Sequence, residues 1–197
     1  VSTIGDDDRG ERIRREIERH GLCGTYVQTD PVHPTGYVTV MTDAEGQSFY
    51  TIHEQVAFDY IDVGEKTASK LADEDFDVFC FGTVEQRSST TRRSLFRILE
   101  TIQKRDHSTA VFCDLNLRQP YFSHEVIQDS LKYCDILKLN EEEAAVISDL
   151  IFPELNLANN CRNFCVCVSE TYGLELVVIT RGSDGCVVFG KNVFFEQ

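Results

Sequence analysis

Two kinds of hydrophobic pattern alternate along this chain and divide it into regions of different structure. In most of the chain, short apolar runs alternate with segments whose apolar residues recur at helical spacing. Residues 25–61 differ, because runs rich in β-branched and aromatic residues at 26–29, 36–41 and 48–52 are separated by proline, glycine and aspartate. The first pattern predicts alternating strands and helices, and the second predicts a β-meander that interrupts them.

The stretch 110–147 shows the strand–helix alternation most clearly. Apolar runs at 110–113 and 135–139 each end at a cluster of polar residues. Between these runs, apolar residues recur at helical spacing: Val126, Ile127, Leu131 and Cys134. This order predicts strand, polar loop, helix, strand, polar loop and helix. In such units, ligands bind where the carboxyl ends of parallel strands meet the following loops.

The same patterns predict the remaining elements. We expect further strands at 2–4, 76–81, 175–180, 186–190 and 193–195, helices at 11–20, 88–105 and 156–170, and turns at 44–46 and 181–185. These elements predict an α/β fold with a doubly wound, mostly parallel sheet and helices on both faces.

The domain organisation follows from the change of pattern. Residues 1–24 and 62–197 are predicted to form the α/β core, and residues 25–61 a small β lid beside it. Aromatic side chains of such a lid would cover a ligand or form a dimer face.

Four polar clusters each follow one predicted apolar strand. They are Gly82-Thr83, Asp114-x-Asn116-x-Arg118, Asn140-x-x-Glu143 and Thr180-x-Gly182-x-x-Gly185. If the strands are parallel, their carboxyl ends share one edge of the sheet, and all four clusters lie along that edge. We take this convergence as stronger evidence for a binding site than any single cluster.

Two of the clusters have both a structural and a functional interpretation. Asn140 and Glu143 form a capping box at a helix start, or the carboxylate holds a water molecule on Mg²⁺. The stretch from Thr180 to Gly185 is a hairpin turn between two strands, or its glycines let backbone amides approach phosphates.

The cluster that contains Arg118 also has both a structural and a functional interpretation. Arg118 forms a surface ion pair, or its guanidinium grips a phosphate or carboxylate. Asp114 orients Arg118 or caps the loop. Near the amino terminus, Gly5-x-Asp7-x-x-Gly10 by itself predicts only a turn that leads into a helix.

Composition and charge limit the partners and the cellular location that the chain can have. The net charge of −14 over 197 residues argues against nucleic acid as a partner, and no apolar run approaches the length of a membrane span. A phosphate ligand would therefore need loop amides, a helix N-terminus or a metal ion. The eight cysteines contain no CxxC and no zinc spacing, which favours a reduced, cytoplasmic protein.

Six motifs together make a family resemblance visible. In order they are Gly5-Asp6-Asp7-x-x-Gly10, Pro34-Thr35-Gly36, Phe81-Gly82-Thr83, Asp114-Leu115-Asn116-Leu117-Arg118, Lys138-x-Asn140-x-x-Glu143 and Thr180-x-Gly182-x-x-Gly185. This series resembles the PfkB/ribokinase family of carbohydrate kinases, and within it the fructokinase-like branch. The resemblance extends over essentially the whole chain but covers only the central portion of the family's fold.

The resemblance implies ATP-dependent phosphorylation of a sugar hydroxyl, with fructose or a related ketose as substrate, and a homodimer through the β lid. It implies that Asn140 and Glu143 organise Mg²⁺ and the nucleotide phosphates, partly through water. The other implied site residues are Lys138, Thr180, Gly182 and Gly185 for the nucleotide, Asn116 and Arg118 near the transferred phosphate, and Thr35, Gly36, Gln86 and Arg87 for the substrate or lid.

The resemblance also implies missing parts. The family's opening strand, with a substrate-binding aspartate and paired glycines, is expected before Val1, and its Gly-Ala-Gly-Asp motif after Gln197. No carboxylate in the chain matches the family's catalytic base, so we expect the polypeptide as given to be inactive.

Two alternative functions stay open, and a third is disfavoured. A nucleoside or sugar-acid kinase of the same family is one, since Arg87 and Arg118 would suit an acidic substrate. A non-catalytic nucleotide- or sugar-binding protein is another. A dinucleotide-binding domain is disfavoured, because no GxGxxG follows a first strand.

Overall fold

The computed structural model of the chain describes residues 1–43, 46–105, 109–118, 120–155, 160–191 and 193–197. The chain divides into two compact units. Unit 1 comprises residues 1–64 and 88–96, and unit 2 comprises residues 65–87 and 97–197. Helix α3 (Ser89–Gln103) contributes its first half to unit 1 and its second half to unit 2.

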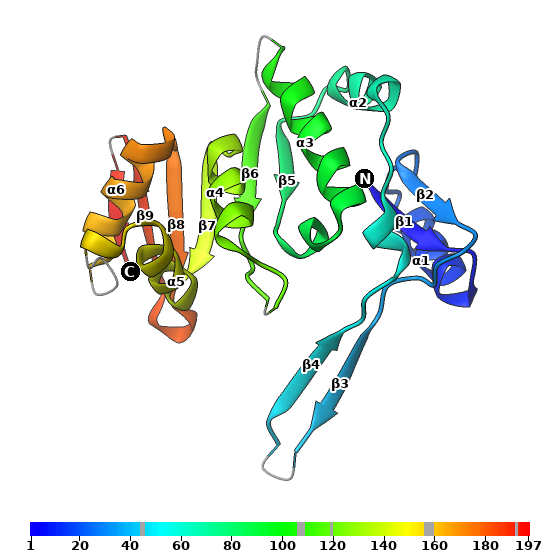
Figure 1. Ribbon diagram of the computed structural model, residues 1–197, viewed down its shortest axis with the longest axis horizontal. Helices are drawn as coiled ribbons and strands as arrows, with labels where there is room; N and C mark the ends of the chain where they lie inside the picture. Colours follow the sequence, from blue (N-terminus) through cyan, green and yellow to red (C-terminus); the bar gives the residue numbers. More distant parts are fainter. Residues whose placement is uncertain (44–45, 106–108, 119, 156–159, 192) are drawn as a thin grey trace. The chain divides into compact units, whose positions relative to one another are not determined.

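Unit 2 is built on a six-stranded sheet with the strand order β10-β9-β8-β7-β6-β5 (Figure 1). Its strands are β5 (Val78–Phe81), β6 (Ala110–Asp114), β7 (Ile136–Asn140), β8 (Leu176–Thr180), β9 (Cys186–Gly190) and β10 (Val193–Glu196). Strands β5 to β8 are parallel to one another, whereas β9 and β10 are antiparallel to their neighbours. The prediction of a mostly parallel sheet is confirmed, and the carboxyl ends of β5 to β8 share one edge.

Helices α4 (His124–Tyr133), α5 (Glu141–Ile151) and α6 (Cys161–Tyr172) pack on this sheet, and unit 2 also contains the short helix α2 (Glu65–Ala72). Helix α4 contacts β6, α5 contacts β7 and β8, and α6 contacts β8 and β9. The interface is apolar, with residues such as Leu115, Leu137, Ile147 and Ile179 fully buried. Side-chain caps from Ser123, Asn140 and Asn160 begin α4, α5 and α6.

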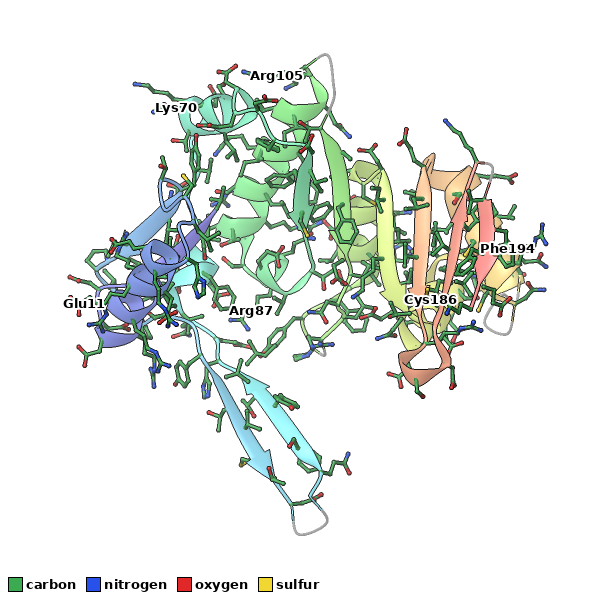
Figure 2. The ribbon with its side chains drawn as sticks, turned by 180° about the vertical axis from the view of Figure 1, so that it is seen from behind. Glu11, Lys70, Arg87, Arg105, Cys186 and Phe194 are labelled. Carbon is green, nitrogen blue, oxygen red and sulfur yellow. The ribbon has the colours of Figure 1, made fainter. Side chains whose placement is uncertain are left out.

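Two helices of unit 2 differ from their predicted form. The pattern did not indicate α2, a short helix that buries only Ala68 and Leu71. Arg105 holds its end through an ion pair with Asp73, and Figure 2 shows Arg105 near Lys70 of this helix. Helix α6 runs from Cys161 to Tyr172 and overlaps most of the predicted range 156–170, of which residues 156–159 lie outside the described part of the chain.

Unit 1 contains two small sheets. Strands β1 (Ser2–Gly5) and β2 (Val27–Asp30) are parallel and are joined by helix α1 (Asp8–Arg19). Strands β3 (Val38–Thr42) and β4 (Ser48–Ile52) form an antiparallel hairpin, which extends away from β1 and β2 in Figure 1.

The short 3₁₀ segments in the described part of the chain are Ala57–Tyr60, Val84–Arg87, Pro153–Leu155 and Gly182–Asp184.

The predicted meander over 25–61 is therefore corrected. Strand β2 pairs with β1 through a strand–helix–strand unit, and only β3 and β4 pair as a hairpin. The predicted turn at 44–46 includes residues 44 and 45, which lie outside the described residues. The division into a core of 1–24 and 62–197 and a lid of 25–61 stays a prediction. Of the helices in the described ranges, none has the length and apolar character needed to cross a membrane.

Candidate functional site at the ends of the parallel strands

The loop after β6 carries two of the predicted site residues, Asn116 and Arg118. Both are exposed, and Asn116 has a φ of +44°, a left-handed conformation that asparagine tolerates better than most residues. The first residue of the loop is held in place, because Leu115 is fully buried and donates its N–H to the Lys138 carbonyl at 3.1 Å. Arg118 donates from Nη1 to the Leu117 carbonyl at 3.0 Å.

Glu143 at the start of α5 has a side chain that connects two segments of this edge. It is only 6% exposed, and its Oε2 accepts the Asn140 N–H at 2.8 Å while Asn140 Oδ1 accepts the Glu143 N–H at 2.8 Å. The predicted capping box is thus present. The second oxygen, Oε1, accepts the N–H of Leu117 at 2.7 Å. One carboxylate therefore joins the helix start after β7 to the loop after β6.

The first turn of α5 is strongly acidic. Glu141, Glu142 and Glu143 follow one another there, with the first two exposed. These carboxylates suit the positive end of the helix dipole, but they repel a phosphate placed near it. A polyphosphate at this edge would therefore require a cation.

The residues at this edge fit a water-coordinated cation. Each oxygen of Glu143 accepts one N–H and retains acceptor capacity. Within the described part of the chain, no three His, Cys, Asp or Glu side chains are grouped so as to hold a metal ion. Mg²⁺ usually keeps several of its waters and takes one or two carboxylates plus substrate phosphates, which is the kind of site that Asn140 and Glu143 would offer.

Lys138 and Asp114 face each other across β6 and β7, where they are paired in register. The Lys138 Nζ lies 2.9 and 3.0 Å from the two Asp114 carboxylate oxygens, and both side chains are about one-third exposed. Asp114 thus pairs with Lys138 rather than orienting Arg118. The neighbouring thiol of Cys80 has a raised pKa because of partial burial and because of the nearby Asp114 and Glu85 carboxylates.

The stretch from Thr180 to Gly185 is a hairpin turn between β8 and β9, as the structural interpretation expected. Thr180 pairs with Cys186, and the Arg181 N–H donates to the Gly185 carbonyl at 2.8 Å. Gly182 and Gly185 have φ values of +57° and +88°, so both need glycine's conformational freedom. A Cβ at Gly185 would lie 1.9 Å from the Gln197 carbonyl oxygen.

This hairpin lies beside the capping box. Thr180 is the register partner of Asn140 on the adjacent strand, and its Oγ1 donates to the Leu139 carbonyl at 3.3 Å. Arg181 next to it is held by Glu196, with 2.8 Å between Nη1 and Oε1. Cys186, at the start of β9, is labelled in Figure 2.

Buried polar residues follow β5. Gln86 is 3% exposed, and its Nε2 donates to the Gly82 carbonyl at 2.7 Å and to Ser130 Oγ on α4 at 2.8 Å. Arg87, labelled in Figure 2, lies over the Tyr121 ring with 4.7 Å from Cζ to the centroid. Thr83 is 1% exposed and donates its hydroxyl to the Leu115 carbonyl at 2.7 Å.

Thr35 and Gly36 belong to unit 1. Thr35 is 2% exposed, and its N–H and Oγ1 donate to the two Asp7 carboxylate oxygens at 2.8 and 2.7 Å. Asp7 also caps α1 by accepting the Gly10 N–H at 2.8 Å. These hydrogen bonds, led by that of the Thr35 hydroxyl, lower the pKa of Asp7 to about 2. A side chain at Gly36 would collide with the Phe58 ring, 2.6 Å from the added Cβ.

A cavity of about 270 Å³ adjoins Thr35 and Gly36. Its other lining residues come from β1, α1, β2, the base of the β3–β4 hairpin and the 3₁₀ segment Ala57–Tyr60, and most of them are apolar, such as Ile4, Ile13 and Ile17. Such a lining has few groups for sugar hydroxyls, so the cavity by itself does not indicate a sugar site.

The sheet edge at the carboxyl ends of β5 to β8 in unit 2 therefore brings together most of the predicted site residues. Asn116 and Arg118 follow β6, whereas Lys138, Asn140 and Glu143 lie in or directly after the adjacent strand β7. The Thr180 hairpin follows β8, the next strand of the sheet. Backbone amides and carbonyls, one well-connected carboxylate and exposed polar side chains meet at the place where open α/β sheets bind phosphorylated ligands.

Comparisons with known proteins identify the family of the chain. The chain matches the model of the pfkB family carbohydrate kinases over residues 1–197, and it belongs to this family. It is 24% identical to the fructokinase of Escherichia coli over 199 residues, an alignment that covers 95% of the chain and 59% of that protein.

Solved structures show the same fold. The crystal structure of fructokinase from Xylella fastidiosa with bound ATP has a TM-score of 0.80 at 16% identity, and the match covers 100% of this chain and 59% of that one. Fructokinase from Vibrio cholerae O395 with fructose, ADP and a calcium ion has a TM-score of 0.75 at 16% identity, covering 100% and 61%. The chain thus spans about three fifths of the length of these relatives.

Proposed function

We propose that this chain carries the nucleotide-phosphate side of an ATP-dependent sugar kinase that phosphorylates a hydroxyl of fructose or a related ketose. The observation that carries the proposal is the convergence of polar groups at the carboxyl ends of β5 to β8 in a chain of the pfkB family. The Escherichia coli relative is named fructokinase, which supports fructose as the substrate. The named structures contain ATP, or ADP with fructose, which supports these molecules as ligands.

The roles of the residues follow from their chemistry. Asn116 and Arg118 would contact the transferred phosphate, because an amide and a guanidinium stabilise the charge on its oxygens. The glycines at 182 and 185, together with Thr180 and Lys138, would line the nucleotide. Gln86 and Arg87 would lie toward the acceptor, and Thr35 and Gly36 would belong to the lid.

Asn140 and Glu143 would hold Mg²⁺ through water. When bound, such an ion neutralises charge on the nucleotide phosphates. The chain's own contribution is the capping box, which holds the Glu143 carboxylate in place through hydrogen bonds from two backbone N–H groups.

The test is a sugar panel with the full-length natural protein. ADP release is measured with fructose, other ketoses, nucleosides and sugar acids in the presence of ATP and Mg²⁺. We expect turnover with fructose or a related ketose. Turnover only with sugar acids or nucleosides would show that one of these, and not a ketose, is the substrate. Binding of ATP or sugar without any turnover would favour the non-catalytic alternative.

We further propose that two copies pair through the β3–β4 hairpin. Every residue of β3 is exposed, and Val40, Met41, Phe49 and Tyr50 are about half exposed or more. An apolar surface of this kind is typical of a protein interface. The eight cysteines are thiols rather than disulfides, which suits the cytoplasmic location that the sequence predicts.

A further inference from the structure

The backbone of residues 115–117 is held from two sides by side chains of neighbouring strand ends. We propose that Thr83 is a positioning residue for phosphoryl transfer, because with Glu143 it clamps this backbone and fixes the conformation of Asn116. The catalytic consequence rests on the proposed function, whereas the clamp itself is a property of unit 2.

The first contact comes from the loop after β5. The Thr83 hydroxyl is 2.7 Å from the Leu115 carbonyl oxygen, and both residues are buried, at 1% and 0% exposure. Thr83 is itself fixed, because its carbonyl accepts the Gln86 N–H at 3.0 Å and Gln86 is buried against Gly82 and Ser130. Loss of the hydroxyl would deprive the buried Leu115 carbonyl of this donor, which is costly.

The second contact comes from the start of α5. Glu143 Oε1 accepts the Leu117 N–H at 2.7 Å, while its Oε2 is held at the helix start. The two contacts thus flank Asn116 on the carbonyl side of Leu115 and the amide side of Leu117. Thr83 lies in the loop after β5 and Glu143 lies in the first turn of the helix after β7, so the clamp joins β5, β6 and β7 at their carboxyl ends.

Asn116 has the conformation that needs such a clamp. It is exposed, so its own packing does not hold it, and its φ of +44° is unfavourable for a residue with a side chain. Once either contact is lost, the backbone gains access to commoner conformations. Asn116 and Arg118 would then spend less time where a phosphate is gripped, and small displacements of such groups reduce rates by about 100-fold.

A purely structural role for Thr83 makes a different prediction. A hydroxyl that only satisfies a buried carbonyl would change the stability of the fold and leave turnover intact. Thr109 supplies the matched control, because its hydroxyl donates to the Phe76 carbonyl at 3.0 Å. That contact joins the same two strands, β5 and β6, at their opposite ends.

The experiment compares Thr83→Val, Thr83→Ser and Thr109→Val. Amide hydrogen exchange of residues 115–118, kcat and KM are all measured in the full-length natural protein. We expect Thr83→Val to speed exchange at Leu117 by about tenfold or more and to lower kcat by about 10- to 100-fold, with KM for ATP and sugar within about threefold. Thr83→Ser should restore both, and Thr109→Val should change neither.

The outcomes separate the proposals. Normal exchange at Leu117 in Thr83→Val would overturn the clamp. Faster exchange with unchanged kcat would overturn the positioning role, as would an equal loss of kcat in Thr109→Val. If the natural protein phosphorylates no sugar, the proposed function fails and the catalytic part of this inference fails with it, while the exchange data still decide the clamp.

Discussion

Glu143 and Asp7 each connect two segments through one carboxylate. Glu143 caps α5 and binds the loop after β6, and Asp7 caps α1 and binds Thr35. The sequence predicts the capping half of the Glu143 arrangement, because a capping box is a local pattern. It does not predict the Leu117 contact or the Thr35 contact, since these join residues 26 and 28 positions apart.

The two functions of Glu143 make Glu143→Ala informative. We expect the free energy of unfolding to fall by about 1–2 kcal/mol from the lost cap, and kcat to fall by orders of magnitude if the carboxylate also serves Mg²⁺. Urea denaturation and steady-state kinetics measure the two effects. Glu142→Ala in the same turn is the control, because this residue is exposed. A stability loss with normal kcat would leave Glu143 as a structural cap only.

The lowered pKa of Asp7 predicts a pH dependence of stability. A carboxyl whose pKa is lower in the folded than in the unfolded state stabilises the protein above its unfolded pKa, and this contribution is lost as pH falls through the folded pKa. With a folded pKa of about 2, the loss falls between about pH 4 and pH 2. We therefore expect Asp7→Asn to be less stable than wild type at neutral pH and to lose less stability in that window.

Thermal unfolding from pH 7 to pH 2 measures this difference. Asp6→Asn is the control, because Asp6 is an exposed neighbour at the same turn. Parallel stability curves for wild type and Asp7→Asn over the acid window would contradict the account.

At the level of strands and helices, strongly periodic segments are predictable and weakly patterned ones are not. Strands β6 to β8 have the alternating burial of sheet interiors, and no end of their predicted ranges differs from the observed end by more than one residue. Helix α2 escapes prediction because only two of its eight residues are buried. Strand β2 was assigned to the wrong sheet, because a short β-rich run does not reveal its partner.

The β3–β4 hairpin carries a prediction about assembly. Val40 and Tyr50 are register partners, 54% and 70% exposed, and their burial in a dimer would stabilise the pair. We expect light scattering to give twice the 22.4 kDa chain mass for wild type and the single-chain mass for the double variant Val40→Thr, Tyr50→Thr. Gln47→Ala, at an exposed position before β4, is the control. A wild-type chain that stays monomeric at high concentration would contradict this proposal.

For the molecule as a whole, the sequence predicts where the candidate site lies better than how its residues interact. Four polar clusters at strand ends indicate one sheet edge, and the parallel order of β5 to β8 confirms that edge. The pairing of Lys138 with Asp114 and the clamp on residues 115–117 depend on contacts between strands, which require the sheet register. The roles of these residues toward ATP and sugar stay predictions.

The most direct test of sugar phosphorylation is ³¹P NMR of the full-length natural protein with ATP, Mg²⁺ and fructose. The account predicts that the γ-phosphate signal of ATP is lost as signals of ADP and of a sugar phosphate ester appear in equal amounts, and that omission of fructose prevents both. Release of inorganic phosphate without an ester, or no change across the sugar panel, would contradict it.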